Sequence, residues 1–242
     1  MAWSPAPTRT LATTGNARRM AAVVRARSAS YNRRVRPTLV LLVRHGQTPT
    51  TGKVLPGQAP GLHLAEEGQR QANVVAARID KLPKVAAVYA SQLERARETA
   101  LPIARNHGLA VRVDRDLADG DIGEWTGQKL RHIARKPEWQ TVQRHPSGFR
   151  FPGGESFIEM QARMVGALAR IVERHPGAVV VAVSHADPIK AAVAHALGIH
   201  LDLFQRIMIA PCSVTAIGYH RHGPVVLTVN SVDGDLGWLG GK

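Results

Sequence analysis

The sequence predicts an α/β fold: a three-layer sandwich in which helices cover both faces of a mostly parallel central sheet. From residue 38 onward, short apolar runs alternate with longer amphipathic segments, which is the pattern of parallel strands connected by helices. The chain has 242 residues, 44% of them hydrophobic, and this size and composition suit one domain with a sizeable core. No internal repeat or further domain boundary interrupts the alternation.

Each element is predicted from its own stretch of sequence. Short apolar runs predict strands, at residues 38–43, 85–89, 110–113, 178–183, 212–219 and 225–229. Amphipathic segments with apolar residues at helical spacing predict helices, at residues 66–82, 93–107, 155–174 and 188–197. The strands near 110–113 and 225–229 are the shorter ones.

Residues 1–36 differ in composition from the rest of the chain. They hold eight arginines and no acidic residue, so that eight of the net +14 charges lie there and the remainder is only moderately basic. Weak periodicity and a closing Pro37 predict a flexible basic extension, followed by one globular domain over residues 37–242. A targeting peptide, an arm that binds nucleic acid or membranes, and translated upstream sequence all fit this extension. We expect it to take no part in the chemistry.

Some classes of protein are disfavoured by the composition. No apolar window is long enough to span a bilayer, and the single Cys212 allows neither an intramolecular disulfide nor a thiolate metal cluster. The other histidines lack metal-ligand spacing, and Cys212 is expected to be a small buried hydrophobe. We therefore expect a cytoplasmic protein without a membrane span, whose core domain forms no stable complex with nucleic acid. The sequence leaves open whether the protein forms a homodimer.

Cationic side chains follow three of the predicted strands. "LVLLVRHGQTPTT" runs an apolar strand into Arg44 and His45, "VVVAVSHADPIK" does the same with His185, and "VAAVYASQLERARETA" places Arg95 just after a strand end. Ligands of open α/β sheets bind at the carboxyl ends of strands. Solvated surface charges would explain one such strand end. Three of them favour a site for a multiply charged anion such as phosphate, because guanidinium groups bind its oxygens in pairs.

These residues resemble the motifs of the histidine phosphatase superfamily, which includes cofactor-dependent phosphoglycerate mutase and many small phosphatases. "LVRHGQT" resembles its signature, "SQLERARETA" its second arginine motif, "PGGES" a common loop and helix start, and "VSHADPIK" its second histidine motif. The four motifs occur in the family's order over residues 39–219, which makes the match specific.

The resemblance implies a role for each of the strand-end residues. His45 is the implied nucleophile that takes the phosphoryl group, with Arg44, Arg95 and His185 binding and neutralising its oxygens. A neutral imidazole is a competent nucleophile, and fixed cations stabilise the charge spread over the phosphoryl oxygens. Because arginines supply that charge, no metal and no cofactor are expected.

The family's proton donor, usually Glu, is replaced here by Asp119. Either carboxylic acid can protonate the leaving oxygen and then activate water, but Asp is one methylene shorter. Asp121 and Glu124 lie nearby in the sequence and are alternative candidates for the proton donor. The simpler interpretation is that Asp121 is a solvated turn residue and Glu124 a carboxylate at a helix N-terminus.

Three further positions are expected to contribute to substrate binding. Thr51 stands where many relatives have Asn, and its hydroxyl can still bond phosphate. Ala186 stands where many have Gly, which is tolerable if this residue keeps a negative φ and offers its amide at a helix N-terminus. Gln58 is a candidate for contact with the substrate beyond the phosphate, although a polar loop residue is the simpler reading.

The sequence therefore predicts a metal-independent phosphatase that hydrolyses phosphate monoesters of small metabolites through a phosphohistidine on His45. A phosphoglycerate-type phosphomutase and a non-catalytic basic binding protein are the alternatives. The mutases that this fold resembles carry longer insertions around the site, which favours the phosphatase. Substrate choice is expected to lie in residues 126–156, a basic and aromatic segment over the crevice that includes Lys129, Arg131, Arg135, Trp139 and Phe149.

Overall fold

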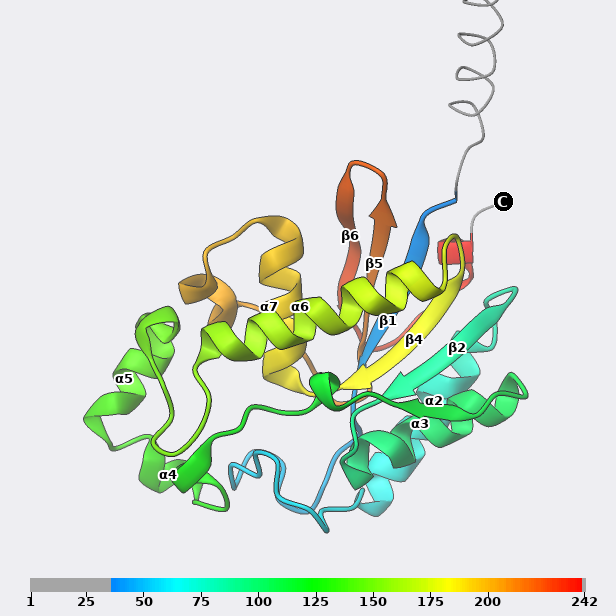
Figure 1. The fold of residues 1–242 in the computed structure, drawn as a ribbon. Coiled ribbons are helices and arrows are strands. Elements are labelled where there is room, and N and C mark those ends of the chain that lie inside the picture. Colours follow the sequence, from blue (N-terminus) through cyan, green and yellow to red (C-terminus); the bar gives the residue numbers. More distant parts are fainter. Residues whose placement is uncertain (1–35, 241–242) are drawn as a thin grey trace, which may run out of the picture. The chain divides into compact units, whose positions relative to one another are not determined.

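The computed structural model describes residues 36–240, and the expectations for the basic extension up to residue 35 fall outside them. A single six-stranded sheet forms the centre, in the order β3-β2-β4-β1-β5-β6 (Figure 1). Its strands are β1 (Thr38–Arg44), β2 (Val85–Ala90), β3 (Val111–Val113), β4 (Val179–Ser184), β5 (Val214–His220) and β6 (Gly223–Ser231).

The sheet is mostly parallel, as predicted. The strands β1, β2, β3 and β4 pair in parallel, whereas β5 pairs antiparallel with both β1 and β6. A tight hairpin turn joins β5 to β6, which is why these two strands need no crossover helix.

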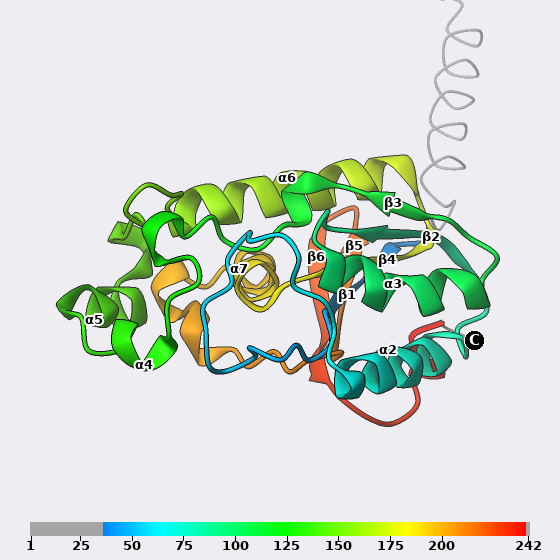
Figure 2. The same ribbon diagram turned by 90° about the horizontal axis from the view of Figure 1, so that it is seen from below.

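Helices cover both faces of the sheet, so the predicted three layers are confirmed. α2 (Glu66–Ile79) and α3 (Glu94–Asn106) pack on one face, and α6 (Phe157–Arg174) and α7 (Ala186–Leu197) pack on the other (Figure 2). Alternate residues of β1 supply the two cores: Leu41 faces α2 and α3, while Leu42 faces α6 and α7. Both side chains are fully buried.

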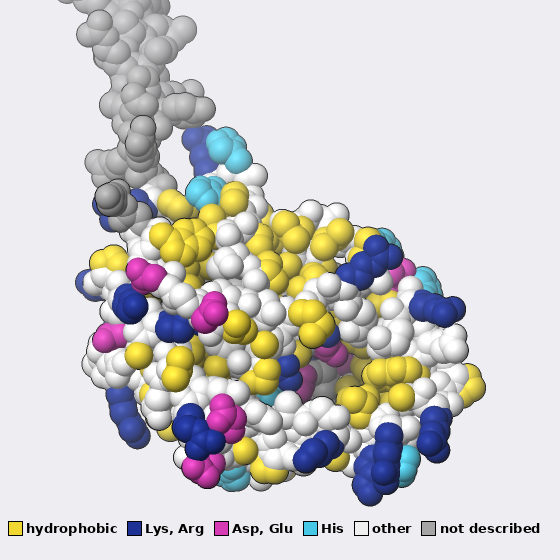
Figure 3. Space-filling view, turned by 180° about the vertical axis from the view of Figure 1, so that it is seen from behind, with side chains coloured by type: hydrophobic (Ala, Val, Ile, Leu, Met, Phe, Trp, Pro, Cys, Tyr) yellow, Lys and Arg dark blue, Asp and Glu magenta, His cyan; other side chains and the backbone are white. Residues whose placement is uncertain are grey.

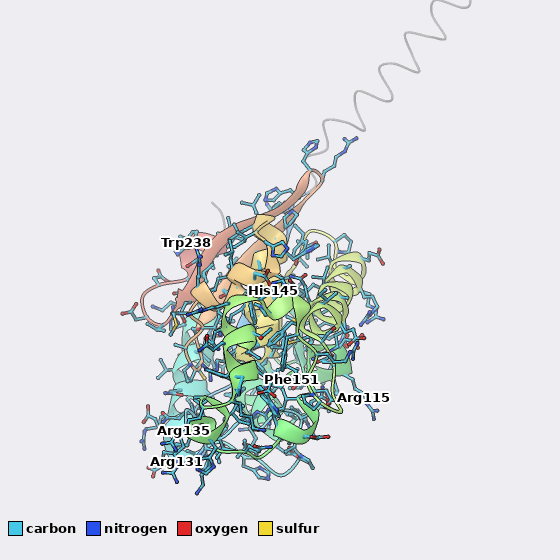
Figure 4. The ribbon with its side chains drawn as sticks, turned by 90° about the vertical axis from the view of Figure 1, so that its left-hand side faces the viewer. Arg115, Arg131, Arg135, His145, Phe151 and Trp238 are labelled. Atoms are coloured by element: carbon cyan, nitrogen blue, oxygen red, sulfur yellow. The ribbon has the colours of Figure 1, made fainter. Side chains whose placement is uncertain are left out.

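A third apolar cluster lies beyond the sheet, in the segment between β3 and α6. It joins α4 (Leu130–Ile133) and α5 (Pro137–Arg144) to the start of α6 and the end of α7. Its centre is a set of stacked aromatic rings that includes Trp125, Phe149, Phe151 and Phe157. Figure 4 shows Phe151 inside this segment, whereas Arg131 and Arg135 lie at its edge. We call residues 126–156 the lid.

Local chemistry sets several boundaries differently from the sequence prediction. α6 begins at Phe157 rather than at residue 155, because Ser156 and Glu159 form a capping box. α7 begins two residues before Pro188, which is tolerated there because amides of the first turn have no helical acceptor. β5 begins at Val214 because Cys212 has a left-handed backbone, with φ 52°. None of the helices within residues 36–240 is long and apolar enough to cross a bilayer.

Candidate active site

Three neighbouring strand ends bring the predicted residues to one edge of the sheet. β4 lies between β2 and β1, and the amide of His45 donates to the carbonyl of Ser184 at the end of β4 (3.0 Å). On the other side, the amide of Ser91 donates to the carbonyl of Val183 (3.1 Å). Because all three strands are parallel, His45, Ser91 and His185 leave the sheet side by side.

His45 is held as a neutral imidazole with one defined free nitrogen. Its Nδ1 lies 2.7 Å from the carbonyl oxygen of Gly46, and since a carbonyl only accepts, Nδ1 carries the proton. The lone pair is therefore on Nε2. The side chain is buried, and burial together with the neighbouring His185 and the guanidinium groups of Arg95 and Arg44 holds its pKa well below 6.5.

Close backbone packing fixes the loop that carries His45. The first turn of α2 lies against this loop, so that a Cβ on Gly46 would meet the Gly68 carbonyl oxygen at 2.5 Å. A Cβ on Gly68 would overlap the Gln47 carbonyl oxygen. Only glycine at both positions permits this approach, and the amide of Gly46 also donates to Thr99 of α3 (3.0 Å).

Arg95 and Arg44 present buried guanidinium nitrogens to the site. Arg95 is fully buried and donates through Nη2 to the Gly57 carbonyl and to Asp119, whereas its Nε and Nη1 have no partner in the described chain. Arg44 donates through Nη1 to the Ile209 carbonyl, and its Nε has no partner there. Burial lowers the pKa of Arg44, but arginine keeps its charge. Buried donors without acceptors are costly, and an anion relieves that cost.

His185 completes the cationic side of the site. Its ring lies 5.0 Å from that of His45, and its Nε2 shares a hydrogen bond with the Ser91 hydroxyl (2.8 Å). Burial lowers the pKa of His185 well below 6.5, and Arg95, Arg163 and Arg44 lower it further. The sequence did not assign Ser91 a role, although its place at the end of β2 could have suggested one.

Asp119 is the carboxylate that the structure places beside these groups. Its Oδ2 lies 3.1 Å from Arg95 Nη2 and 3.7 Å from His185 Nδ1. Its backbone carbonyl accepts from the Gln58 amide and from Arg163, both at 2.8 Å. Asp121 and Glu124, the two nearby carboxylates, are exposed and do not line the cavity described next.

A cavity of about 380 Å³ opens in front of these residues, lined by Arg44, His45, Asp119 and Ala186 among others. Acidic and basic side chains meet in this hollow (Figure 3). Ala186 begins α7 with a negative φ, as expected, so its amide lies at the helix N-terminus. Thr51 also lines the cavity, although its hydroxyl accepts from the amide of Thr48 (2.8 Å).

Two sets of sequence-predicted residues lie elsewhere. Gln58 does not line the cavity, and its amide instead holds the carbonyl of Asp119. Of the five lid residues singled out in the sequence, Trp139 lines the cavity. The other four do not, namely Lys129, Arg131, Arg135 and Phe149. Within residues 36–240, no group of three or more His, Cys, Asp or Glu side chains is placed to hold a metal ion.

Comparison with known proteins shows the family. Residues 40–232 match the histidine phosphatase superfamily (branch 1), and the chain belongs to this superfamily. A bifunctional protein of Mycobacterium tuberculosis is 35% identical over 194 residues, which cover 77% of this chain and 52% of that protein. The chain thus spans about half the length of that relative.

Further relatives carry both phosphatase and mutase names. A phosphoserine phosphatase of Hydrogenobacter thermophilus is 30% identical, with 79% of this chain and 91% of that protein covered. A probable phosphoglycerate mutase of Cronobacter sakazakii is 33% identical, with 75% and 85% covered. The solved structure of a mycobacterial glucosyl-3-phosphoglycerate phosphatase superposes with a TM-score of 0.73 at 26% identity, covering 81% of this chain and 100% of that one. The solved structure shares the α/β fold of this chain, and the named relatives include both a phosphatase and a probable mutase.

Proposed function

We propose that this chain hydrolyses phosphate monoesters without a metal ion, through a phosphohistidine on His45. The observation that carries the proposal is the neutral His45 with a free Nε2, at the same strand ends as buried nitrogens of Arg44, Arg95 and His185 that have no hydrogen-bond partner within residues 36–240. The phosphatase names among the relatives and among the structural neighbours support the same class of reaction.

The first step forms a bond between His45 Nε2 and phosphorus while the bond from phosphorus to the alcohol oxygen breaks. Asp119 gives its proton to the departing oxygen, which leaves as a neutral alcohol. Nδ1 of the phosphorylated ring keeps its proton, and the Gly46 carbonyl stabilises the positive charge on that ring. Arg44, Arg95 and His185 bind the phosphoryl oxygens, on which the charge is spread in the transition state.

The second step returns the enzyme to its starting state. The Asp119 carboxylate takes a proton from a water molecule, whose oxygen attacks phosphorus as the bond to Nε2 breaks. Inorganic phosphate leaves, Nε2 regains its lone pair, and Asp119 is protonated for the next turnover. Two displacements of moderate difficulty thus replace a single difficult one.

The experiment that tests this proposal traps the intermediate. We expect brief incubation of the protein with a radiolabelled phosphate ester in EDTA, followed by denaturation, to leave an acid-labile, base-stable phosphoryl group on His45. His45→Ala should lose both the label and turnover. His220→Ala, which changes an exposed histidine at the end of β5, is the matched control and should keep both. Label on a serine or cysteine contradicts the mechanism, and transfer of the phosphoryl group to a second alcohol in place of water indicates a mutase.

A further inference from the structure

Three polar side chains line the cavity beside the proposed phosphate site, two of them from the first turns of α7. Lys190 follows Ala186 by one turn on the same side of α7, and its Nζ lies 3.0 Å from Asp187 Oδ1. The same nitrogen lies 3.0 Å from Oε1 of Gln205, in the short 3-10 helix η4 (Leu201–Arg206). Lys190, Asp187 and Gln205 all line the cavity, and we call them the polar trio.

The polar trio offers both donors and acceptors to a ligand. A lysine has three N–H donors, and the two bonds to Asp187 and Gln205 leave one of them. Asp187 keeps Oδ2 as an acceptor, and Gln205 keeps its amide nitrogen as a donor. A hydroxyl group both donates and accepts, so it matches this set. A carboxylate only accepts, and here it meets the Asp187 carboxylate beside a lysine that is already paired.

The position and surroundings of the polar trio suit the alcohol part of a small phosphate ester. One helical turn is about 5.4 Å, which places the backbone of Lys190 roughly that far beyond the N-terminal amide of α7. Its Nζ reaches back to Asp187 in the first turn. Figure 2 looks along α7 and shows the chain after β1 passing around its end. The rest of the wall is largely apolar and includes Leu130, Trp139 and Met160, which pack against a carbon skeleton or a sugar ring.

We infer that the polar trio binds the alcohol part of the substrate and selects phosphate monoesters of polyols or sugars over esters that carry a carboxylate. This inference rests on the proposed phosphatase function and adds a substrate class to it. Phosphoserine and 3-phosphoglycerate, which bear carboxylates, are therefore expected to be poor substrates of this chain. The basic residues Lys129, Arg131 and Arg135 do not offset this preference, because they do not line the cavity.

The test compares kcat/KM for three probes: glycerol 3-phosphate, 3-phosphoglycerate and nitrophenyl phosphate. We expect the wild type to prefer glycerol 3-phosphate over 3-phosphoglycerate by about tenfold or more, the size of effect that one mismatched polar group produces. Asp187→Asn frees Lys190 and removes the negative charge, so it should reduce that preference by about tenfold. Lys190→Met should lower kcat/KM for glycerol 3-phosphate by about tenfold and affect nitrophenyl phosphate least.

Controls separate substrate recognition from a merely structural bond between α7 and η4. Asp235→Asn disrupts an exposed pair with Lys81 far from the cavity and should leave all three values unchanged. Unaltered substrate ratios in both Asp187→Asn and Lys190→Met overturn the inference, even if both variants are less stable.

Binding measurements test the role of the polar trio separately from the proposed phosphatase reaction. Calorimetry on His45→Ala, which lacks the proposed nucleophile, gives the affinities for glycerol 3-phosphate and 3-phosphoglycerate without turnover. We expect tighter binding of glycerol 3-phosphate, with the difference reduced when Asp187→Asn is added. Equal affinities overturn the inference. Failure of the wild type to hydrolyse even nitrophenyl phosphate overturns the proposed function instead, and the affinities still decide the role of the polar trio.

Discussion

The two buried histidines differ in what their hydrogen bonds allow. His45 donates to a carbonyl, so its tautomer is fixed and Nε2 stays available for attack. His185 shares a bond with the Ser91 hydroxyl, which can donate or accept, so this ring can be neutral or protonated without losing its partner. A bound phosphate dianion favours a proton on His185, because it offsets the positive charges that lower the histidine's pKa. His45 is therefore suited to attack and His185 to donation.

The role of Asp119 can be tested by comparing esters with poor and good leaving groups. Asp119→Asn should lower kcat for alkyl phosphates by ~10²–10⁴, the range for loss of a general acid. Nitrophenyl phosphate should suffer less in the first step, because its leaving group needs little protonation. Asp119→Glu should keep or raise activity, since the longer side chain restores the family's usual reach. The measurement is kcat as a function of pH, for both classes of ester, in the wild type and each variant. Small and equal effects on both classes exclude Asp119 as the acid, and Glu124→Gln, the control variant, then becomes the next test.

At the scale of elements, the parts of the site on strand ends could be predicted and the parts on irregular chain could not. The apolar run of β1 ends at Arg44 and that of β4 just before His185, so sequence alone brought these residues to one edge. The helices α4 and α5 are short and were not predicted. Gln205 reaches the cavity from η4, whose position depends on packing of Phe204 in the third apolar cluster, against Phe157 at the start of α6, and on no local pattern.

The long helix α6 positions the segment that carries Asp119. Arg163 donates to the backbone carbonyls of Asp116, Ala118 and Asp119 and forms an ion pair with Glu155. The side chains of Arg163 and Glu155 are only 17% and 15% exposed. Arg163 is thus a positioning residue, because it acts on the acid through three carbonyl groups and does not line the cavity.

Replacing Arg163 should affect both stability and catalysis. Arg163→Met leaves Glu155 without its charged partner, with only the Asp121 amide still donating to it, and we expect the free energy of unfolding to fall by about 3 kcal/mol. Displacement of Asp119 should lower kcat for alkyl phosphates by roughly 10²-fold, and that for nitrophenyl phosphate by less. Arg150→Met is the matched control, because its pair with Glu159 is exposed and worth only ~0–1 kcal/mol. Denaturant titrations and the two rates measure these effects. Equal losses for both esters would show that Arg163 does not act through Asp119, and unchanged rates would show that it serves stability alone.

For the molecule as a whole, the site makes folding depend on pH. The fold buries His45 and His185 next to Arg44 and Arg95, and both histidines are neutral there because their pKa values lie well below 6.5. In the unfolded chain the same side chains titrate near 6.5. Below that pH the two histidines are protonated in the unfolded chain but stay neutral in the folded protein. Stability falls wherever the unfolded state binds more protons than the folded state. The histidines thus impose no penalty above pH 6.5 and a growing one below it.

We therefore expect the free energy of unfolding to decrease as the pH falls from about 6.5, by up to about 1.4 kcal/mol per pH unit for each of the two histidines. Carboxylates whose pKa values are lowered in the fold, such as Glu159 at about 2, add their own loss only below about 4.5. Denaturant titrations at about pH 8, 6.5 and 5.5, which span the range in which histidine titrates, measure the slope. The double variant His45→Gln, His185→Gln should flatten the slope between pH 6.5 and 5.5. Because glutamine does not titrate, an unchanged slope in this variant would show that the pH dependence arises elsewhere in the chain.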